Sequence, residues 1–294
     1  MAEHTRLRLD IQTQPDDTTC GPTCLHAVYR FYGDAVSLQD VIDTAPIIPG
    51  EGGAGGEEGG QGSRGTLAVM LGCHALRRGY RARLFTFNLN LFDPTWFPGA
   101  SDRPGNAETL RSKLRSQLAA KAPGDPRLAL ATESYIEFLD RGGEIWLRDL
   151  SSGLLSKFLR KGRPVLTGLS ATYLYRCARE YGPRDDYDDI RGEPAGHFVI
   201  LCGYDADSRC VQVADPMRDN PAFKSLVYDV PIARLVAAIM LGVLTYDANL
   251  LVIEPPEPAE PPRKRAKART RASGAPATSD GAPPSESPGA GGGG

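Results

Sequence analysis

The chain has 294 residues, a formal net charge of −2 at pH 7, 41% hydrophobic residues and 24% charged residues. This composition is typical of a folded chain with a sizeable core, and the lack of an overall basic excess points away from a nucleic-acid partner. No apolar run approaches the roughly 20 residues needed to span a bilayer, so we expect no membrane partner.

Cysteine usage and the N-terminal segment indicate the compartment. The first eight residues contain no apolar core of a signal peptide, which favours a cytoplasmic location. The six cysteines are few for the length of the chain, and none has the spacing of a zinc site. We therefore expect reduced thiols, no metal and no cofactor.

The first chemically informative segment surrounds Cys20. A polar, turn-rich stretch that starts at Gln14 leads into Cys20-Gly21-Pro22 and then into an apolar periodic segment. Proline is favoured at the first helical position, which predicts a helix over 22–32 with Cys20 at its N-terminus. The positive end of a helix stabilises a thiolate, and Gln14 could donate an amide N–H to a developing oxyanion. The alternative is a buried thiol in a helix cap.

The middle of the chain reads as alternating helices and strands. Residues 50–65 are mostly glycine and glutamate, which predicts a flexible insertion. Asparagine, aspartate and serine residues at the ends of loops predict helix caps. Helices are expected after Ser37, over 67–78, after Asn106, after Asp125 and over 152–160, and strands over 5–13, 80–87, 144–147 and 164–169.

Residues 171–194 are polar and charged, with an acidic run at 185–189. We expect an insertion that immediately precedes the next strand. Its carboxylates could bind a basic substrate segment or gate a cleft, or the insertion could be only a solvated loop. The acidic spacing does not match a calcium-binding loop.

Two β-rich runs follow, one from His197 to Asp205 and one from Cys210 to Asp215. The short polar connection between them predicts a β-hairpin. With the hairpin centred on Ala206, His197 faces Asp215 at a Cβ separation of roughly 5 Å. A carboxylate beside an imidazole fixes its tautomer and directs it toward a nucleophile. Of the four histidines, only His197 gains a carboxylate in this way.

The same register has a second consequence. It sets Cys202 opposite Cys210, on the face of the hairpin away from His197. A disulfide could form there, whereas a reducing cytosol favours two buried thiols.

The C-terminal part combines further strands with a tail. Strands over 225–230 and 250–253 around a helix over 232–240 complete a predicted α+β fold with a mainly antiparallel sheet, in one domain of residues 1–253. Residues 254–294 are dominated by Pro, Ala, Gly and Ser, which predicts a disordered tail. Its basic run over 263–271 could contact an acidic partner or nucleic acid, act as a nuclear signal, or be incidental charge.

Cys20, His197, Asp215 and Gln14 form a coherent set of nucleophile, base, orienting carboxylate and oxyanion donor. The motifs Gln-x5-Cys-Gly-Pro, His-Phe-Val-Ile-Leu-x-Gly-Tyr-Asp and Ala-Asp-Pro resemble those of the bacteriocin-processing cysteine peptidases. The resemblance implies a papain-like fold, these four residues in these roles, and cleavage of leader peptides after a double glycine. The sequence is similar to the stand-alone members, which have no transporter domains.

These residues predict a cysteine peptidase that acts on a peptide or protein substrate through an acyl-enzyme. Two alternatives keep the same residues. An amine in place of water would give a thiol-dependent acyltransferase, and a chain that retains the fold without turnover would be a silent peptide-binding module.

Overall fold

The computed structural model describes residues 4–48, 65–97, 102–121, 124–182, 184–245 and 247–256. The predicted flexible insertion, apart from Gly65, and residues 257–294 of the predicted tail lie outside the described residues, and both stay predictions. The predicted start of the tail at residue 254 is wrong, because Glu254 is the buried last residue of the final strand. The helices are α1 (Cys20–Phe31), α2 (Leu38–Thr44), α3 (Ala68–Arg77), α4 (Ala107–Lys121), α5 (Pro126–Asp140), α6 (Ser152–Arg160), α7 (Ala171–Tyr175) and α8 (Ile232–Leu241), with short 3-10 turns η1 (Pro94–Trp96) and η3 (Gly242–Thr245).

One large sheet runs through the fold, in the order β3-β2-β10-β4-β7-β8-β9, with β1 paired to β7 beyond the end of β4. All of its pairs are antiparallel except β2 with β3. The last strand, β10, lies between β2 and β4, near the middle of the sheet. The strands are β1 (His4–Arg6), β2 (Arg81–Thr86), β3 (Glu144–Trp146), β4 (Val165–Ser170), β7 (Gly196–Asp205), β8 (Cys210–Ala214), β9 (Val227–Pro231) and β10 (Asn249–Glu254), and a separate ribbon pairs β5 (Glu180–Tyr181) with β6 (Asp186–Tyr187).

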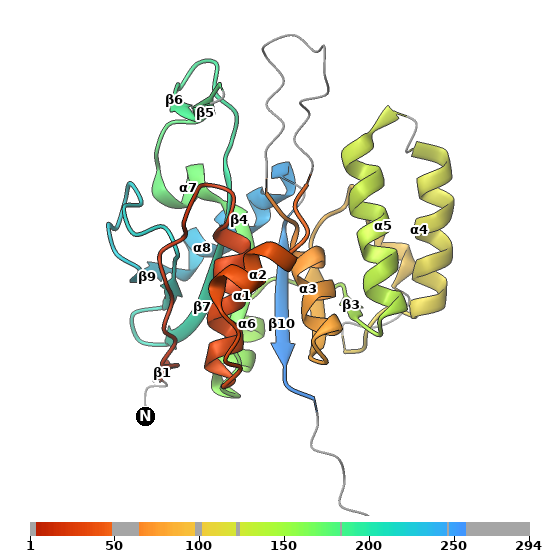
Figure 1. Cartoon of the computed structure of the whole chain (residues 1–294), viewed down its shortest axis with the longest axis horizontal. Coiled ribbons are helices and arrows are strands. Elements are labelled where there is room, and N and C mark those ends of the chain that lie inside the picture. Colours follow the sequence, from red (N-terminus) through yellow and green to blue (C-terminus); the bar gives the residue numbers. More distant parts are fainter. Residues whose placement is uncertain are drawn as a thin grey trace, which may run out of the picture. The chain divides into compact units, whose positions relative to one another are not determined.

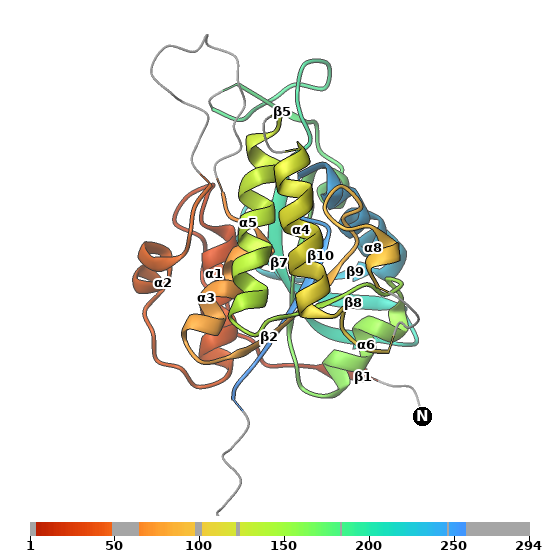
Figure 2. The ribbon, with the colours of Figure 1, turned by 90° about the vertical axis from the view of Figure 1, so that its right-hand side faces the viewer.

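Helices cover both faces of this sheet (Figures 1 and 2). The buried side chains of α1, α3, α4 and α5 form one hydrophobic cluster, and those of α6, α7 and α8 form a second on the opposite face. The predicted α+β class is confirmed, because α1, which begins at Cys20, packs against a mainly antiparallel sheet. Among the described residues, no helix has the length and apolarity that crossing a bilayer requires.

Several helices begin where the sequence predicts, because their caps are local. Ser37 Oγ accepts a hydrogen bond from an N–H in the first turn of α2, at 3.1 Å. Asn106 and Asp125 do the same for α4 and α5, at 2.9 and 2.8 Å. These side chains satisfy donors that a helix leaves unpaired at its start, and a helix can therefore be located from a few residues of sequence.

Helix α1 begins at Cys20, two residues before the predicted start at Pro22. The prediction placed proline at the first helical position, whereas Pro22 is the third residue of the helix. The N–H groups of the whole first turn lack partners within the helix, so a proline costs no hydrogen bond at any of these positions. The correction places Cys20 itself in the first turn.

The start of α3 is capped from a distance. Leu67, which precedes the helix, has no side chain that could accept a hydrogen bond, and Asp247 Oδ1 instead accepts one from Ala68 N at 3.0 Å. The same oxygen accepts a hydrogen bond from Asn249 Nδ2 at 3.1 Å. Asp247 is buried, and this burial raises the pKa of its carboxyl to about 7, although both hydrogen bonds and the charge of Arg127 act to lower it.

Residues 171–194, predicted as a polar insertion, contain a short helix and a two-stranded ribbon and are not only a solvated loop. Helix α7 is capped by Ser170 Oγ, which accepts a hydrogen bond from Tyr173 N at 3.3 Å, and it ends at Arg176 in a left-handed conformation. The ribbon of β5 and β6 follows, and an isolated bridge between Glu180 and Glu193 ties it to the segment that leads into β7.

Candidate active site

Cys20 lies at the N-terminal end of α1, and its side chain is partly exposed. The preceding turn is ordered by Asp16, whose carboxylate accepts hydrogen bonds from the N–H and the hydroxyl of Thr18, at 2.8 and 2.7 Å. No acidic side chain lies in the first turn of α1, and the side chain of Thr19, which precedes the helix, makes no capping hydrogen bond. The positive end of the helix dipole is therefore available to a negative charge on the Cys20 sulfur.

Close packing brings this end of α1 onto the start of β7. A Cβ atom at Gly21 would lie 2.5 Å from Thr66 Cγ2 and 3.2 Å from the ring of Phe198, so only glycine fits here without a shift. One turn later, Cys24 Sγ donates a hydrogen bond to the carbonyl of Phe198 at 3.3 Å. Because Phe198 follows His197 in β7, these contacts place Cys20 beside His197.

His197 and Asp215 are in direct contact. His197 Nε2 lies 2.8 Å from Asp215 Oδ1, and the two residues are 5% and 0% exposed. A hydrogen bond from Nε2 leaves Nδ1 as the ring nitrogen that can exchange a proton with Cys20.

The predicted hairpin register is nevertheless wrong. Ile200 pairs with Ala214, so Asp215 extends β8 opposite residue 199 rather than opposite His197. Positions 197 and 199 share one face of β7, which is why Asp215 can still reach His197 diagonally. The error arises at the turn, because the four-residue turn after Asp205 is centred beyond Ala206, and the register shift between Leu201 and Gly203 offsets only part of the error.

The predicted pairing of Cys202 with Cys210 fails for the same reason. Cys210 pairs with Asp205, whereas Cys202 Sγ lies 3.6 Å from the carbonyl of Gln212. All six cysteines are free thiols.

The Asp215 carboxylate accepts hydrogen bonds on both oxygens. Oδ1 receives His197 Nε2 and Met217 N, each at 2.8 Å. Oδ2 receives the hydroxyls of Tyr175, at 2.7 Å, and Tyr228. Complete burial acts to raise the pKa of Asp215, but His197 and the two tyrosine hydroxyls outweigh it and hold that pKa below its usual value.

His197 carries the opposite shift. Burial acts to lower its pKa, but the Asp215 charge, the hydrogen bond to Asp215 and the neighbouring Cys20 thiol together raise it to about 10. The raised pKa favours the protonated imidazole at neutral pH, and the Asp215 carboxylate compensates its charge.

Gln14 lies between the segments that carry the other candidates. Its backbone N–H donates to the carbonyl of Pro216, next to Asp215, at 3.0 Å. Its side-chain Nε2 donates to the carbonyl of Asp16 at 2.9 Å, and its buried Oε1 has no hydrogen-bond partner among the residues that the structure describes. A primary amide has a second N–H, which remains for another acceptor. The oxyanion role of Gln14 stays a prediction.

Near the His197–Asp215 pair, acidic side chains from two segments lie close enough to change one another's pKa. Burial, followed by the charges of Asp185 and Asp17, raises the pKa of Glu180, and His197 opposes this effect. Glu180 belongs to β5, Asp185 to the turn before β6, and Asp17 to the loop before Cys20. Ribbon β5–β6 lies beyond the N-terminal end of α1 (Figure 1). Recognition of a basic substrate segment by this ribbon stays a prediction.

Sequence reasoning missed the two tyrosines on Asp215. Alternation along β9 marks Tyr228 and Val230 as inward-facing, but it does not name their partners. Tyr175 lies within the segment that was predicted to be a polar insertion. Neither position carries a motif that would have linked it to Asp215.

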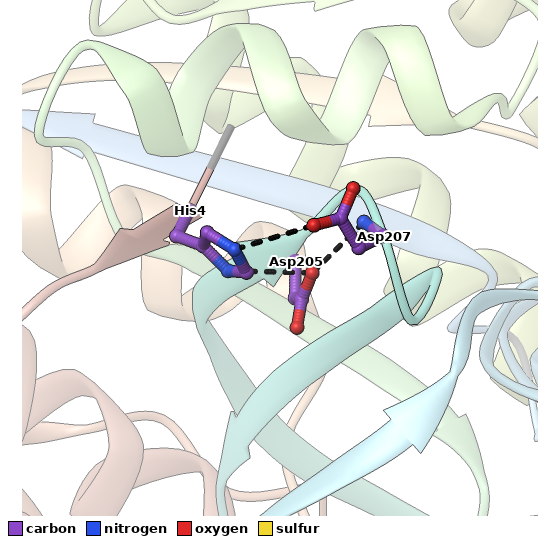
Figure 3. A group of neighbouring side chains, drawn as sticks. All are labelled: His4, Asp205 and Asp207. Atoms are coloured by element: carbon purple, nitrogen blue, oxygen red, sulfur yellow. Dashed lines mark hydrogen bonds and ion pairs between the residues drawn. The ribbon is translucent and has the colours of Figure 1, made fainter. Parts of the chain in front are cut away.

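One group among the described residues could hold a metal ion. His4, Asp205 and Asp207 offer donor atoms within 4.8 Å of one another (Figure 3). His4 and Asp207 are exposed, and His4 Nδ1 lies 3.3 Å from Asp205 Oδ1, so a surface ion pair accounts for the group. Asp205 ends β7, whereas His197 lies near the start of that strand, so the group and the candidate active site lie at opposite ends of β7.

Residues 151–233 match the Peptidase_C39 like family, and this segment includes His197 and Asp215 but not Cys20 or Gln14. No curated protein matches the chain. A solved structure from Bacillus anthracis, assigned as a C39-like peptidase, matches with a TM-score of 0.41 and 15% identity, over 85% of this chain and 97% of that one. The segment that carries the histidine–aspartate pair is thus similar to the Peptidase_C39 like family.

Proposed function

We propose that the protein is a cysteine peptidase that hydrolyses a peptide or amide bond in a peptide or protein substrate. The observation that carries the proposal is the buried 2.8 Å contact between His197 Nε2 and Asp215 Oδ1, next to a cysteine at a helix N-terminus. The similarity of residues 151–233 to the Peptidase_C39 like family supports it.

In the first half of the proposed reaction, the Cys20 thiolate attacks the carbonyl carbon of the scissile bond. The π electrons move to the carbonyl oxygen, where the Gln14 amide and the Cys20 backbone N–H stabilise the negative charge. As the C–N bond breaks, His197 Nδ1 gives its proton to the leaving amine, and an acyl thioester remains on Cys20.

In the second half, water attacks the thioester while His197 Nδ1 takes one of its protons. The C–S bond breaks, the acid product leaves, and the proton on His197 restores the thiolate–imidazolium pair. Asp215 stays ionised throughout and stabilises the imidazolium.

The test uses the full chain and a defined peptide library, with products read by mass spectrometry. Peptides with a Gly-Gly pair form one arm, because the resemblance to bacteriocin-processing peptidases implies cleavage there. We expect cleavage that Cys20→Ala and His197→Ala abolish and that Cys210→Ala, which removes another partly exposed thiol, leaves intact. Cleavage that survives Cys20→Ala would refute the proposal.

We also propose that the protein works in the cytoplasm. All six cysteines are thiols, which suits a reducing compartment.

A further inference from the structure

The contacts on Asp215 exceed what orienting a histidine requires. One carboxylate oxygen, Oδ1, meets His197 Nε2 and a backbone N–H. The other, Oδ2, accepts hydroxyl hydrogen bonds from Tyr175, the last residue of α7, and from Tyr228 on β9. These tyrosines are 5% and 9% exposed. Asp215 is thus held from two elements that lie outside its own hairpin.

The partition of donors between the two oxygens fixes the carboxylate plane. A rotation about the Cβ–Cγ bond of Asp215 would break hydrogen bonds on both oxygens at once. The rotation that turns Oδ1 away from His197 also takes Oδ2 away from Tyr175 and Tyr228. Hydrogen bonds to a charged acceptor are about twice as strong as neutral ones, so this restraint is considerable.

Packing explains the tyrosine rings but not their hydroxyls. The ring of Tyr228 stacks on Phe223 with centroids 3.8 Å apart and planes 7° apart, and the ring of Tyr175 lies 6.1 Å from that of His197. A phenylalanine would make the same ring contacts. The hydroxyls alone reach Asp215, and removing one would leave a buried carboxylate oxygen with one donor fewer.

On the basis of the proposed function, we propose that Tyr175 and Tyr228 are positioning residues. They form a tyrosine clamp that holds Asp215 so that Oδ1 meets His197 Nε2 and the ring presents Nδ1 to Cys20. The clamp acts on the ionised carboxylate and touches neither substrate nor the reacting atoms. The titratable groups that face Asp215 come from β7, α7, β9 and α1, namely His197, Tyr175, Tyr228 and Cys24.

The first test is a double-mutant cycle that requires no substrate. Tyr175→Phe and Tyr228→Phe are each made in the natural chain and in Asp215→Asn, and urea unfolding midpoints are compared. Asparagine keeps the shape but carries no charge, so we expect each hydroxyl loss to lower the midpoint clearly in the natural chain and about half as much beside asparagine. Tyr173→Phe, on the exposed side of α7, serves as the matched control and should move neither midpoint. Equal losses in the two backgrounds would overturn the clamp.

The second test separates positioning from folding. With a peptide that the natural chain cleaves, each clamp variant should lower kcat about ten- to a hundredfold with KM unchanged, because a misplaced base affects only the chemical step. An unchanged kcat, or a loss that lies entirely in KM, would overturn the positioning role. A natural chain that cleaves no peptide would refute the proposed function. The double-mutant cycle would still decide whether the two tyrosine hydroxyls stabilise the charged carboxylate of Asp215.

Discussion

Asp247 is expected to make the protein less stable as the pH rises from about 4 to about 7. Its carboxyl is buried and caps the first N–H of α3. It lies close to Gly168 of β4, where a Cβ atom would come within 2.8 Å of the Asp247 Cγ, so the site has no room for a hydrated charge. Asp247→Asn keeps a carbonyl oxygen for both observed hydrogen bonds and never ionises.

The size of the effect follows from linkage. Burial raises the pKa of Asp247 from 3.8 to about 7 in the folded protein. Between these values the folded state holds a proton that the unfolded chain has released, so the free energy of unfolding decreases as the pH rises. About three pH units at about 1.4 kcal/mol each give a loss on the order of 4 kcal/mol, complete above about pH 7.

The assay is urea unfolding of the natural chain and of Asp247→Asn at several values between about pH 4 and pH 8. The variant should match or fall below the natural chain at the acid end and exceed its stability by a few kcal/mol at the basic end. Asp140→Asn, which removes an exposed carboxylate paired with Arg111, is the control and should cost less than about 1 kcal/mol. Parallel pH profiles for the natural chain and Asp247→Asn would refute the reasoning.

Three further predictions concern the site and its packing. Iodoacetamide should label Cys20 faster than the partly exposed thiol of Cys210, and His197→Ala should slow the labelling of Cys20, as mass spectrometry would detect. Gln14→Ala should lower kcat about a hundredfold with an unchanged unfolding midpoint, and normal turnover would exclude Gln14 as an oxyanion donor. Gly21→Ala should destabilise the protein by about 1–3 kcal/mol in urea, because its Cβ would lie 2.5 Å from a neighbouring methyl carbon, whereas Gly153→Ala in α6, where the nearest atom is 3.8 Å away, should not.

Helix starts proved predictable because the residues that cause them are adjacent in sequence. Ser37, Asn106 and Asp125 each accept a hydrogen bond from the third residue that follows. The cap of α3 could not be foreseen, since Asp247 reaches Ala68 from 179 residues away. Likewise, no periodicity indicates that β10 lies between β2 and β4.

In the hairpin, sequence reasoning predicts the contact between His197 and Asp215 correctly but from an incorrect strand register. Asp205 Oδ1 accepts hydrogen bonds from the N–H groups of Asp207 and Ser208, at 2.9 and 3.2 Å, and Arg209 adopts a positive φ of 53°. This turn chemistry, typical of an aspartate that starts a turn, would have moved the predicted centre past Ala206. The irregularity after Leu201 depends on pairing with β8 and leaves no comparable signal in the sequence.

The position of β10 affects the order in which a newly synthesised chain can fold. Asn249–Glu254 is the last of the described strands to leave the ribosome, yet both of its neighbours, β2 and β4, depend on it for their pairing along one edge. Until it emerges, those two edges expose unpaired backbone groups that can pair with other chains. Its end is then fixed when the buried Glu254 meets Arg83 and Arg163.

A nascent chain therefore contains Cys20, His197 and Asp215 well before it can complete the sheet that supports them. If the rest of the sheet forms before β10 emerges, it forms as two separate parts. One part contains β2 and β3, the other contains β4, β7, β8 and β9, and the place of β10 between them stays empty. A chain that ends before β10 would contain every candidate catalytic residue. It would also expose the unpaired edges of β2 and β4, and we expect such a product to aggregate or to be degraded.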